Sequence, residues 1–417
     1  MNIFSASFTF HKAGQGAFYG GFIKQRHGNT YYSMVYDCGT SPFITGHTKS
    51  LNDEISLFKS TLISLSDENK PRLDFLFISH LDYDHVSGIK RLLNEFNVRK
   101  IILPYIDPLI RRLLFSTYEE GGNENFLSRD EYESLLINPT EYFMSFNEQA
   151  TIYVVKGEIG DNNSSTDGEI YELGSTGKIE EIGEIRNVKV FNNNLELRIS
   201  KKWDFISHVK EVDSEIIDLI RLEICKILGL SYDDDLSTSA LRELFNVDEN
   251  RKKLRECYKR YLKDINAHGL ALLHGPKNFN TICVGDSECD CYWSCDDWEE
   301  IDNKSLYTLL LGDTSLNLNN NPVKFPKFLL EKLEYVHVVQ IPHHGSSKNW
   351  DQQQYKLLKL GKSLNNSIEL TSVCNYGVGN NYNHPSQDVI HEVDNKLVLN
   401  NQYTRYMTSY CFIEFKN

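Results

Sequence analysis

The stretch Leu73-Asp74-Phe75-Leu76-Phe77-Ile78-Ser79-His80-Leu81-Asp82-Tyr83-Asp84-His85 decides the fold of this 417-residue chain. Its first six residues form a nearly continuous apolar run, which is typical of a strand buried on both faces. Four potential metal ligands, His80, Asp82, Asp84 and His85, then follow within six residues. A loop that leaves the carboxyl end of a strand can direct several side chains into one cavity. The motif therefore predicts a metal site whose imidazole and carboxylate ligands suit Zn²⁺, Mn²⁺ or Fe²⁺.

The segments around this motif predict an α/β protein. A helix over Ile89–Phe96 and a strand over Val98–Leu103 follow the motif and complete a β-α-β order. Upstream, the apolar spacing predicts strands over Ile3–Phe10 and Tyr31–Tyr36 and a helix over Ser50–Leu65. The final third returns to strands, which are expected at Gly269–Leu273, Tyr307–Leu311, Val336–Ile341, Ser367–Cys374 and Ser409–Phe415.

Three of the later strands end in residues that can bind a metal. Leu309-Leu310-Leu311-Gly312-Asp313 delivers a carboxylate, and Val338-Val339-Gln340-Ile341-Pro342-His343-His344-Gly345-Ser346 delivers paired histidines. Asn381-Tyr382-Asn383-His384-Pro385 adds a further histidine after the strand through Val373. A Gly-Asp or His-Pro pair alone is more often turn chemistry than a ligand. All of these pieces in this order, each behind an apolar strand, indicate one shared site.

Together these motifs resemble the metallo-β-lactamase fold, and within it the branch represented by the hydrolase domain of the competence DNA-uptake protein ComEC. That branch also has a Gly-Gln-Gly turn near its start, here Gly14-Gln15-Gly16, and an Asp-x-Gly strand end, here Asp37-Cys38-Gly39. The resemblance covers residues 1–105 and about 265–415. It implies one domain over residues 1–417, folded as a four-layer αββα sandwich with a metal site at its rim.

The resemblance also implies a ligand set for two divalent metal ions, Zn or Mn. His80 and Asp82 would face one metal, and Asp84 and His85 would face the other. Asp313 would bridge the two and His384 would complete the second, whereas His343 or His344 would lie at the metals or over the substrate. Many relatives have a histidine in place of Asp82; a carboxylate there shifts preference toward Mn²⁺, although the affinity order still favours Zn²⁺. Asn266 and His268 are additional candidate ligands, with a structural polar role as the alternative.

Such a site would perform hydrolysis. A divalent metal lowers the pKa of bound water toward neutrality, so hydroxide is available at pH 7. Asp84 is predicted to orient this hydroxide, and His344, with His343 or Ser346 as alternatives, to bind the developing charge or protonate the leaving oxygen. We therefore expect a metal-dependent hydrolase, and the resemblance favours a phosphodiesterase or nuclease with a nucleic acid or nucleotide as substrate.

A basic, Tyr-bearing helix over Arg251–Lys263 adds weight to a phosphodiester substrate. Lys253 and Arg260 are candidate contacts to a phosphate backbone. The alternative interpretation is an ordinary solvated helix face. Two further functions stay open: hydrolysis of another ester, a thioester, a lactone or a lactam, and a partner-binding role in a multi-protein bacterial defence system.

Two segments fall outside the motif pattern and are available for a protein partner. Residues 108–263 are predicted to be a variable, largely helical insertion, and residues 283–302 a cysteine-rich, acidic insertion between core strands. Cys283, Cys289, Cys291 and Cys295 fall within thirteen residues but lack the usual Cys-x₂-Cys spacing. A structural zinc site and a reduced loop therefore both remain open.

The composition excludes several classes of protein. The chain has 58 acidic and 44 basic residues and a net charge of −14, which argues against a protein that coats nucleic acid. Its apolar runs are far shorter than the roughly 20 residues of a membrane-spanning helix, and Met1–Phe10 does not resemble a secretory signal. We therefore expect a cytoplasmic protein that does not bind membranes and keeps its nine cysteines reduced.

Overall fold

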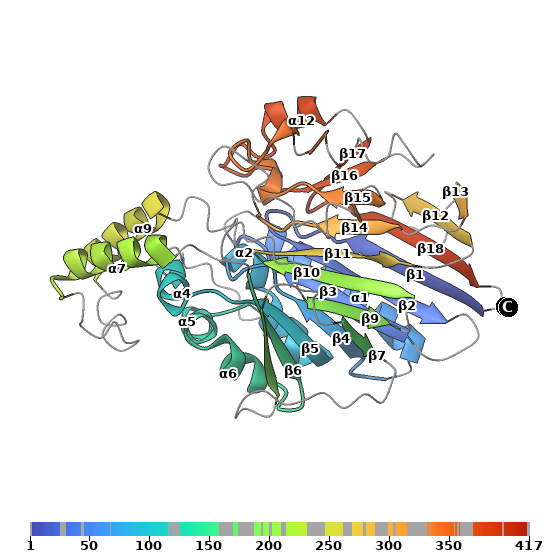
Figure 1. The fold of residues 1–417 in the computed structure, drawn as a ribbon, viewed down its shortest axis with the longest axis horizontal. Coiled ribbons are helices and arrows are strands. Elements are labelled where there is room, and N and C mark those ends of the chain that lie inside the picture. The colour runs from blue at the N-terminus through green and yellow to red at the C-terminus, as the bar shows by residue number, and fades with distance from the viewer. Residues whose placement is uncertain are drawn as a thin grey trace.

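The computed structural model describes residues 2–414 except 26–30, 43–45, 67, 116–117, 119–125, 158–169, 174–186, 193–194, 200–201, 210–213, 232–246, 262–268, 278–280, 288–298, 303–305, 315–331, 334, 354, 357, 359–369 and 394–395. The described strands form two large sheets that lie face to face (Figure 1). Apolar side chains fill the space between the sheets and the space between each sheet and its helices.

The first sheet is built around the strand that precedes the metal motif. Its spatial order is β13 (Glu299–Asp302), β12 (Thr281–Ser287), β18 (Tyr406–Glu414), β1 (Asn2–Phe10), β2 (Phe18–Gln25), β3 (Tyr31–Cys38), β4 (Arg72–Phe77), β5 (Asn97–Pro104), β6 (Thr151–Lys156) and β8 (Val188–Asn192). β4 runs parallel to β3 and β5, whereas β1 runs antiparallel to β2 and β18. The carboxyl ends of β3, β4 and β5 therefore lie at one edge of the sheet.

The second sheet supplies the other strand ends. Its order is β17 (Lys396–Asn400), β16 (Thr371–Asn375), β15 (Val336–Gln340), β14 (Tyr307–Leu310), β11 (Leu270–Pro276), β10 (Trp203–Val209), β9 (Leu195–Ile199) and β7 (Ile170–Leu173). β14, β15, β16 and β17 are parallel neighbours. Because parallel strands end at the same edge of a sheet, the residues that follow β14, β15 and β16 converge.

The helices lie on the outer faces of the sandwich. Those that bear on the site are α1 (His47–Ser66), α2 (Tyr83–Val86), α3 (Ile89–Glu95), α4 (Pro108–Leu114), α5 (Arg129–Ile137), α6 (Pro139–Met144), α7 (Ser214–Leu228), α9 (Asp248–Tyr261), the 3₁₀ turn η3 (His343–Gly345) and α12 (Gln387–Glu392). Among the residues that the structure describes, no helix is long and apolar enough to cross a bilayer.

The alternation of side chains along β4 shows how the four layers form. Phe75 and Phe77 face the second sheet, where their rings lie 5.2 and 5.8 Å from the ring of Phe205. Leu76 and Ile78 face the opposite way and pack in the cluster that contains the helices α1 and α3. A third cluster joins the outer face of the second sheet to α12. The predicted αββα metallo-β-lactamase sandwich is confirmed.

Residues 108–263, which are predicted to be a largely helical insertion, also contribute strands to both sheets. β6 and β8 from this region extend the first sheet, and β7, β9 and β10 extend the second. The strand β10 was not predicted, because its polar residues Asp204, Ser207 and His208 interrupt the apolar pattern. Asp204 is nevertheless buried, and it forms ion pairs with Arg198 and Lys277. Strand pairing on both sides therefore overrides the polar composition.

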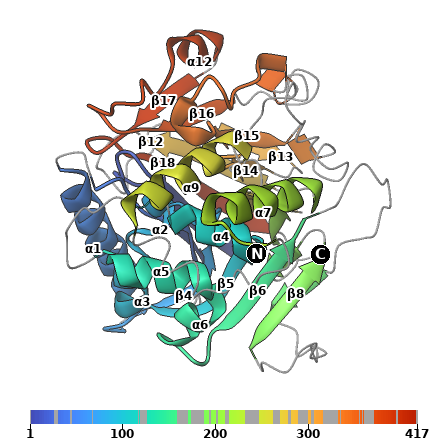
Figure 2. The ribbon, with the colours of Figure 1, turned by 90° about the vertical axis from the view of Figure 1, so that its left-hand side faces the viewer.

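The helical part of this region forms a separate layer beside the sandwich. α7 and α9 pack side by side and contact α4 (Figure 2). They lie on the same side of the molecule as α2, the short helix of the metal motif (Figures 1 and 2). This arrangement places the basic helix at the end of the sandwich where the motif residues gather.

The helix α5 supports the loop of the metal motif. Its amino end has a capping box, in which Ser128 accepts a hydrogen bond from the Glu131 backbone and Glu131 accepts one from the Ser128 backbone. The hydroxyl of the buried Tyr132 then donates to the carbonyl of Leu81 at 2.9 Å. In return, the hydroxyl of Tyr83 donates to the carbonyl of Leu127 at 2.9 Å. These bonds fix the path of the chain between β4 and α2.

Candidate metal centre

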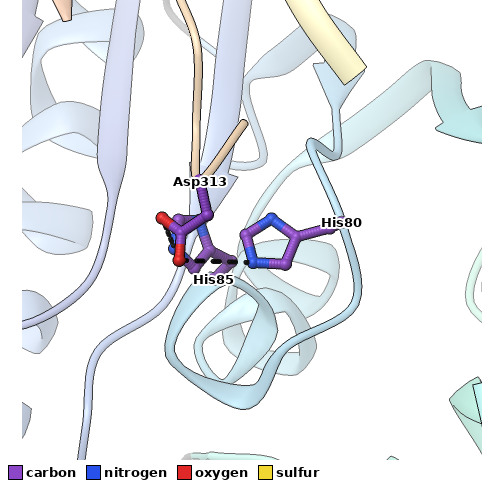
Figure 3. A group of neighbouring side chains, drawn as sticks. All are labelled: His80, His85 and Asp313. Carbon is purple, nitrogen blue, oxygen red and sulfur yellow. Dashed lines mark ion pairs between the residues drawn. The ribbon is translucent and has the colours of Figure 1, made fainter. Parts of the chain in front are cut away.

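The candidate ligands come from four strand ends that meet at one edge of the sandwich. His80, Asp84 and His85 follow β4, and Asp313 follows β14. His343 and His344 form the η3 turn after β15, and His384 follows β16. Figure 3 shows three of them, His80, His85 and Asp313, with their side chains directed toward one another.

Two overlapping groups of side chains have their ligand atoms within 4.8 Å of one another: His80, His85 and Asp313, and Asp84, His85 and His344. In the first group, Nε2 of His85 lies 3.1 Å and Nε2 of His80 lies 3.9 Å from the Asp313 carboxylate (Figure 3). In the second, Nε2 of His344 lies 3.3 Å from Oδ2 of Asp84. Nε2 of His344 is also 3.8 Å from Asp313, so the two groups form one centre that shares His85.

Each buried imidazole is held through its other ring nitrogen. Nδ1 of His85 lies 2.9 Å from Oδ2 of Asp37, and Nδ1 of His344 lies 3.0 Å from the carbonyl oxygen of Asn375. Because these oxygens accept hydrogen bonds, Nδ1 carries the proton in both rings. The hydroxyl of Ser79 donates to Asp37 at 2.6 Å and lies 2.8 Å from Nδ1 of His80. The Nε2 lone pairs are thus left for the centre, which is the usual support of histidine ligands.

The donor atoms fit a divalent metal ion. Nε2 of His80, His85 and His344 are buried, and none makes a hydrogen bond of good geometry within the described residues. Leaving a buried polar atom without such a partner costs about 1–3 kcal/mol. Three imidazoles beside two carboxylates are a ligand set suited to Zn²⁺ or Mn²⁺. A bound ion would satisfy all three nitrogens at once.

The pKa shifts in this centre follow from burial and from the charges of neighbouring histidine and aspartate side chains. Burial and the neighbouring His85 lower the pKa of His80 to about 3, which keeps this ring neutral. Burial alone would raise the pKa of Asp313, but His343, His85 and His344 hold it well below its ordinary value. Burial likewise opposes protonation of His85, yet Asp313 and Asp37 raise its pKa well above the ordinary value. A proton on His85 therefore competes with a metal ion for this position.

The remaining predicted ligands form an outer ring around the two groups. Oδ2 of Asp82 is 3.8 Å from Nε2 of His80, and burial together with Asp84 and Asp313 raises the pKa of Asp82 to about 8. Nδ1 of His343 is 3.6 Å from Asp313, and the ring of His384 lies 5.7 Å from the ring of His343. These three side chains belong to neither group of converging ligand atoms.

This geometry differs from the pairing that the resemblance implies. His80 and His85 share one group, whereas the resemblance assigned them to different metals. The side chain of His344 is only 4% exposed and belongs to the second group, whereas the side chain of His343 is 28% exposed at the rim. The turn thus directs His344 inward toward Asp84 and leaves His343 at the rim, a choice between the two histidines that the sequence leaves open.

The turn that carries these histidines has an unusual backbone. His343, His344 and Gly345 have φ values of 47°, 54° and 80°, in the left-handed region that non-glycine residues rarely adopt. The backbone of His343 donates to the carbonyl of Gly312 at 3.0 Å, and Ser386 donates to the carbonyl of Gly345 at 2.9 Å. Such strain persists only where the surroundings enforce it, and it concentrates at functional sites.

Several supporting residues escaped the sequence analysis as site residues. Asp37 belongs to the Asp-x-Gly strand end, but no sequence pattern indicates that it accepts hydrogen bonds from His85 and Ser79. Gln340 accepts hydrogen bonds from the backbones of Leu311 and Gly312 at 3.1 and 3.0 Å and so shapes the turn before Asp313. A buried amide inside the apolar run Val338–Ile341 was the signal that could have identified it.

The other sequence candidates belong to neither ligand group or fall outside the described residues. Ser346 is buried directly after the η3 turn. Lys253 and Arg260 on α9 form ion pairs with Glu249 at 2.9 Å and Glu223 at 3.1 Å. Asn266, His268, Cys289, Cys291 and Cys295 fall outside the described residues. Of the acidic insertion, the described strands β12 and β13 extend the first sheet, and the backbone of Cys283 pairs with that of Cys411.

Comparison with known proteins finds one family model that matches part of the chain. Residues 28–145 match the model of the metallo-beta-lactamase superfamily, a range that contains Asp37 and the motif from His80 to His85. Two solved structures are similar to the chain at a TM-score of 0.27. Rm3 metallo-beta-lactamase is 10% identical, over 85% of this chain and 91% of that one. MEM-A1, a subclass B3 metallo-beta-lactamase isolated from a soil metagenome library, is 8% identical, over 85% of each chain. No curated protein matches.

Proposed function

We propose that this chain is a metal-dependent hydrolase that cleaves phosphodiesters, as a nuclease or a nucleotide phosphodiesterase. The superfamily match over residues 28–145 supports metal-dependent hydrolysis. The observation that carries the proposal is the convergence of three buried Nε2 atoms, from His80, His85 and His344, on the carboxylates of Asp84 and Asp313. Each of these imidazoles is oriented by a partner at Nδ1, so the arrangement is built to receive a cation.

The residues of the chain have distinct parts in such a reaction. A metal ion held by the two groups would supply Lewis acidity and a water of lowered pKa. Burial alone would raise the pKa of Asp84, but the neighbouring imidazoles of His344 and His85 lower it. Asp84 thus stays ionised and can orient an attacking water. Burial lowers the pKa of His343, whose neutral ring at the rim can donate a hydrogen bond to the leaving oxygen.

A phosphodiester is favoured over other esters by two observations. The motif set resembles the hydrolase domain of ComEC, as described above. In addition, the helix α9 carries Arg251, Lys252, Lys253 and Arg255 and lies on the same side of the molecule as α2 (Figure 2). Lys253 is paired with Glu249 on its own helix, but Lys252 is exposed. A positive surface near the centre would attract a polyanionic substrate.

The test is hydrolysis by purified protein loaded with Mn²⁺ or Zn²⁺. The substrates are single- and double-stranded DNA, RNA and cyclic nucleotides, with bis-p-nitrophenyl phosphate as a generic diester. Asp84→Asn should abolish turnover, whereas Asp130→Asn, which alters an exposed carboxylate on α5, should retain it. Equal activity of wild type and Asp84→Asn would refute the proposal.

The same purified, metal-loaded protein can be used to distinguish the proposed function from the alternative ones. A panel of simple esters, a thioester, a lactone and nitrocefin tests hydrolysis of non-phosphate substrates by the same metal ligands. Turnover of one of these, without turnover of any diester, would assign the chain to that chemistry. A binding partner for residues 108–263 or 283–302 stays a prediction that co-purification of partners can address.

A further inference from the structure

The loop between β16 and α12 presents an exposed aromatic side chain beside the candidate metal centre. Tyr382 is 58% exposed, and its ring lies 6.0 Å from the ring of His384 at an interplanar angle of 34°. The His384 ring is in turn 5.7 Å from that of His343, whose Nδ1 is 3.6 Å from Asp313. An unbroken series of rings thus leads from the centre to the surface. Neither the metal ligands nor the proposed mechanism uses Tyr382.

One side chain fixes Tyr382 and His384 in relation to each other. Nδ2 of Asn380 donates to the carbonyls of Gly377 and His384, both at 2.7 Å. Oδ1 of Asn380 accepts hydrogen bonds from the backbones of Tyr382 at 2.9 Å and His384 at 3.3 Å. The loop is therefore ordered before any ligand arrives, and a contact made by Tyr382 costs little further conformational entropy.

The start of the same loop is joined to the Gly-Gln-Gly turn. The backbone of Gly377 donates to Oε1 of the buried Gln15 at 3.1 Å. The following residue, Val378, is 42% exposed, and Gln402 makes two hydrogen bonds to its backbone. Exposed apolar surface is thus held in place at both ends of a loop that borders the centre. Single exposed apolar residues are common, but here two lie within five positions beside a reactive site.

We propose that Tyr382 is a stacking platform for a nucleobase of the substrate. This assignment rests on the proposed phosphodiesterase function and names the part of the substrate that lies beside the scissile phosphate. An exposed phenol ring offers a flat apolar face, and every base has a flat π face, so such a contact is strong without selecting one sequence. Tyr382 is therefore a specificity residue for nucleotides over simple diesters.

The experiment compares dinucleotides with and without a base. The substrates are thymidylyl-thymidine and two analogues, in each of which tetrahydrofuran replaces the base and sugar of one nucleoside. Their cleavage is measured with metal-loaded wild type, Tyr382→Ala and Tyr382→Phe. Tyr382→Ala should raise the KM for thymidylyl-thymidine about 5- to 150-fold, the range expected for one stacked base, and should leave kcat nearly unchanged. Tyr382→Phe keeps the ring and should resemble wild type. Tyr403→Ala, which removes a 69% exposed tyrosine from the neighbouring loop, is the matched control.

The double comparison separates stacking from support of His384. If Tyr382 stacks a base, removing that base should abolish the effect of Tyr382→Ala, because both changes delete the same contact. If Tyr382→Ala instead reduces kcat/KM equally for all three substrates, Tyr382 only supports His384, and the platform is refuted while the proposed function stands. If wild type cleaves none of the dinucleotides or other diesters, the proposed function itself fails.

Discussion

Oδ2 of Asp37 lies 2.9 Å from Nδ1 of His85 and also accepts the hydroxyl of Ser79 at 2.6 Å. Its other oxygen accepts the backbone of Ser79 at 2.7 Å. The hydroxyl of Ser79 lies in turn 2.8 Å from Nδ1 of His80. One fully buried carboxylate therefore sets the orientation of two candidate ligands, although it is not itself in either ligand group.

Asp37→Asn should weaken metal binding about 10- to 100-fold while the fold is retained. The amide can present a donor to Nδ1 of His85, which then moves its proton to Nε2, the atom that faces the centre. Competition against a chromophoric chelator measures the affinity. Asp74→Asn is the control, because Asp74 is a buried carboxylate on β4 that pairs with Arg72 and Ser33 instead. An equal loss of affinity in both variants would mean that Asp37 acts only through stability.

His85→Ala should remove more bound metal than either His80→Ala or His344→Ala. The reason is that His85 belongs to both ligand groups, whereas each of the other two histidines belongs to one. Native mass spectrometry of proteins reconstituted with Zn²⁺ or Mn²⁺ gives the number of ions per chain. Unchanged metal content in His85→Ala would contradict the shared ligand.

Gly39→Ala should displace the metal motif and reduce metal affinity. A Cβ atom at Gly39 would lie 2.5 Å from the carbonyl oxygen of Asp84, which is too close for any real contact. Overpacking of this kind costs about 1–3 kcal/mol of stability. Gly20→Ala is the matched control, because its Cβ would meet its nearest neighbours at 3.5 Å. Urea unfolding should show a loss of stability, and chelator competition a loss of metal affinity, in Gly39→Ala but not in Gly20→Ala.

Glu54→Gln should destabilise the protein in a pH-dependent way. Glu54 is buried on α1, 2.7 Å from Nδ1 of His11 and 2.9 Å from Nη2 of Arg405. Burial alone would raise the pKa of Glu54, but His11 and Arg405 lower it below its ordinary value of 4.5. A carboxylate with a lowered pKa stabilises the fold above its unfolded pKa, and this stability is lost as the pH falls through the folded pKa.

The expected difference between wild type and Glu54→Gln is roughly 1.5–3 kcal/mol at pH 7, the range for hydrogen bonds to charged groups. It should shrink as the pH falls below 4.5. Urea unfolding of metal-free protein across this range measures it. A difference that stays constant from pH 7 to pH 3 would show that the charge of Glu54 is not responsible.

The sequence was most informative where local pattern and final structure coincide. The strand before His80 could be predicted because it is apolar on both faces, and both faces are buried in β4. The ends of β14, β15 and β16 could be predicted for the same reason. By contrast, β10 could not be predicted, because its buried Asp204 depends on ion pairs with Arg198 of the neighbouring strand β9 and with Lys277, and strand pairing is needed to bring these together.

The grouping of the candidate ligands could not be predicted in the same way. Spacing brings His80 and His85 into one loop, but it does not say that both rings turn toward Asp313. The inward direction of His344 depends on three consecutive residues with left-handed backbone angles, and the sequence His-His does not predict such angles. The supporting contact from Asn375 comes from a backbone carbonyl, to which no side-chain motif corresponds.

The pairing of β1 with β18 has a consequence for how the molecule is made. Residues 2–10 are synthesised long before residues 406–414, yet the two segments are neighbours in the sheet. Until β18 is synthesised, this edge of β1 is open and can pair with other chains. The candidate ligands Asp313, His344 and His384 are likewise synthesised long after His80 and His85. The two groups of candidate ligands are therefore complete only after His344 has been synthesised, so the whole centre cannot form earlier on a growing chain.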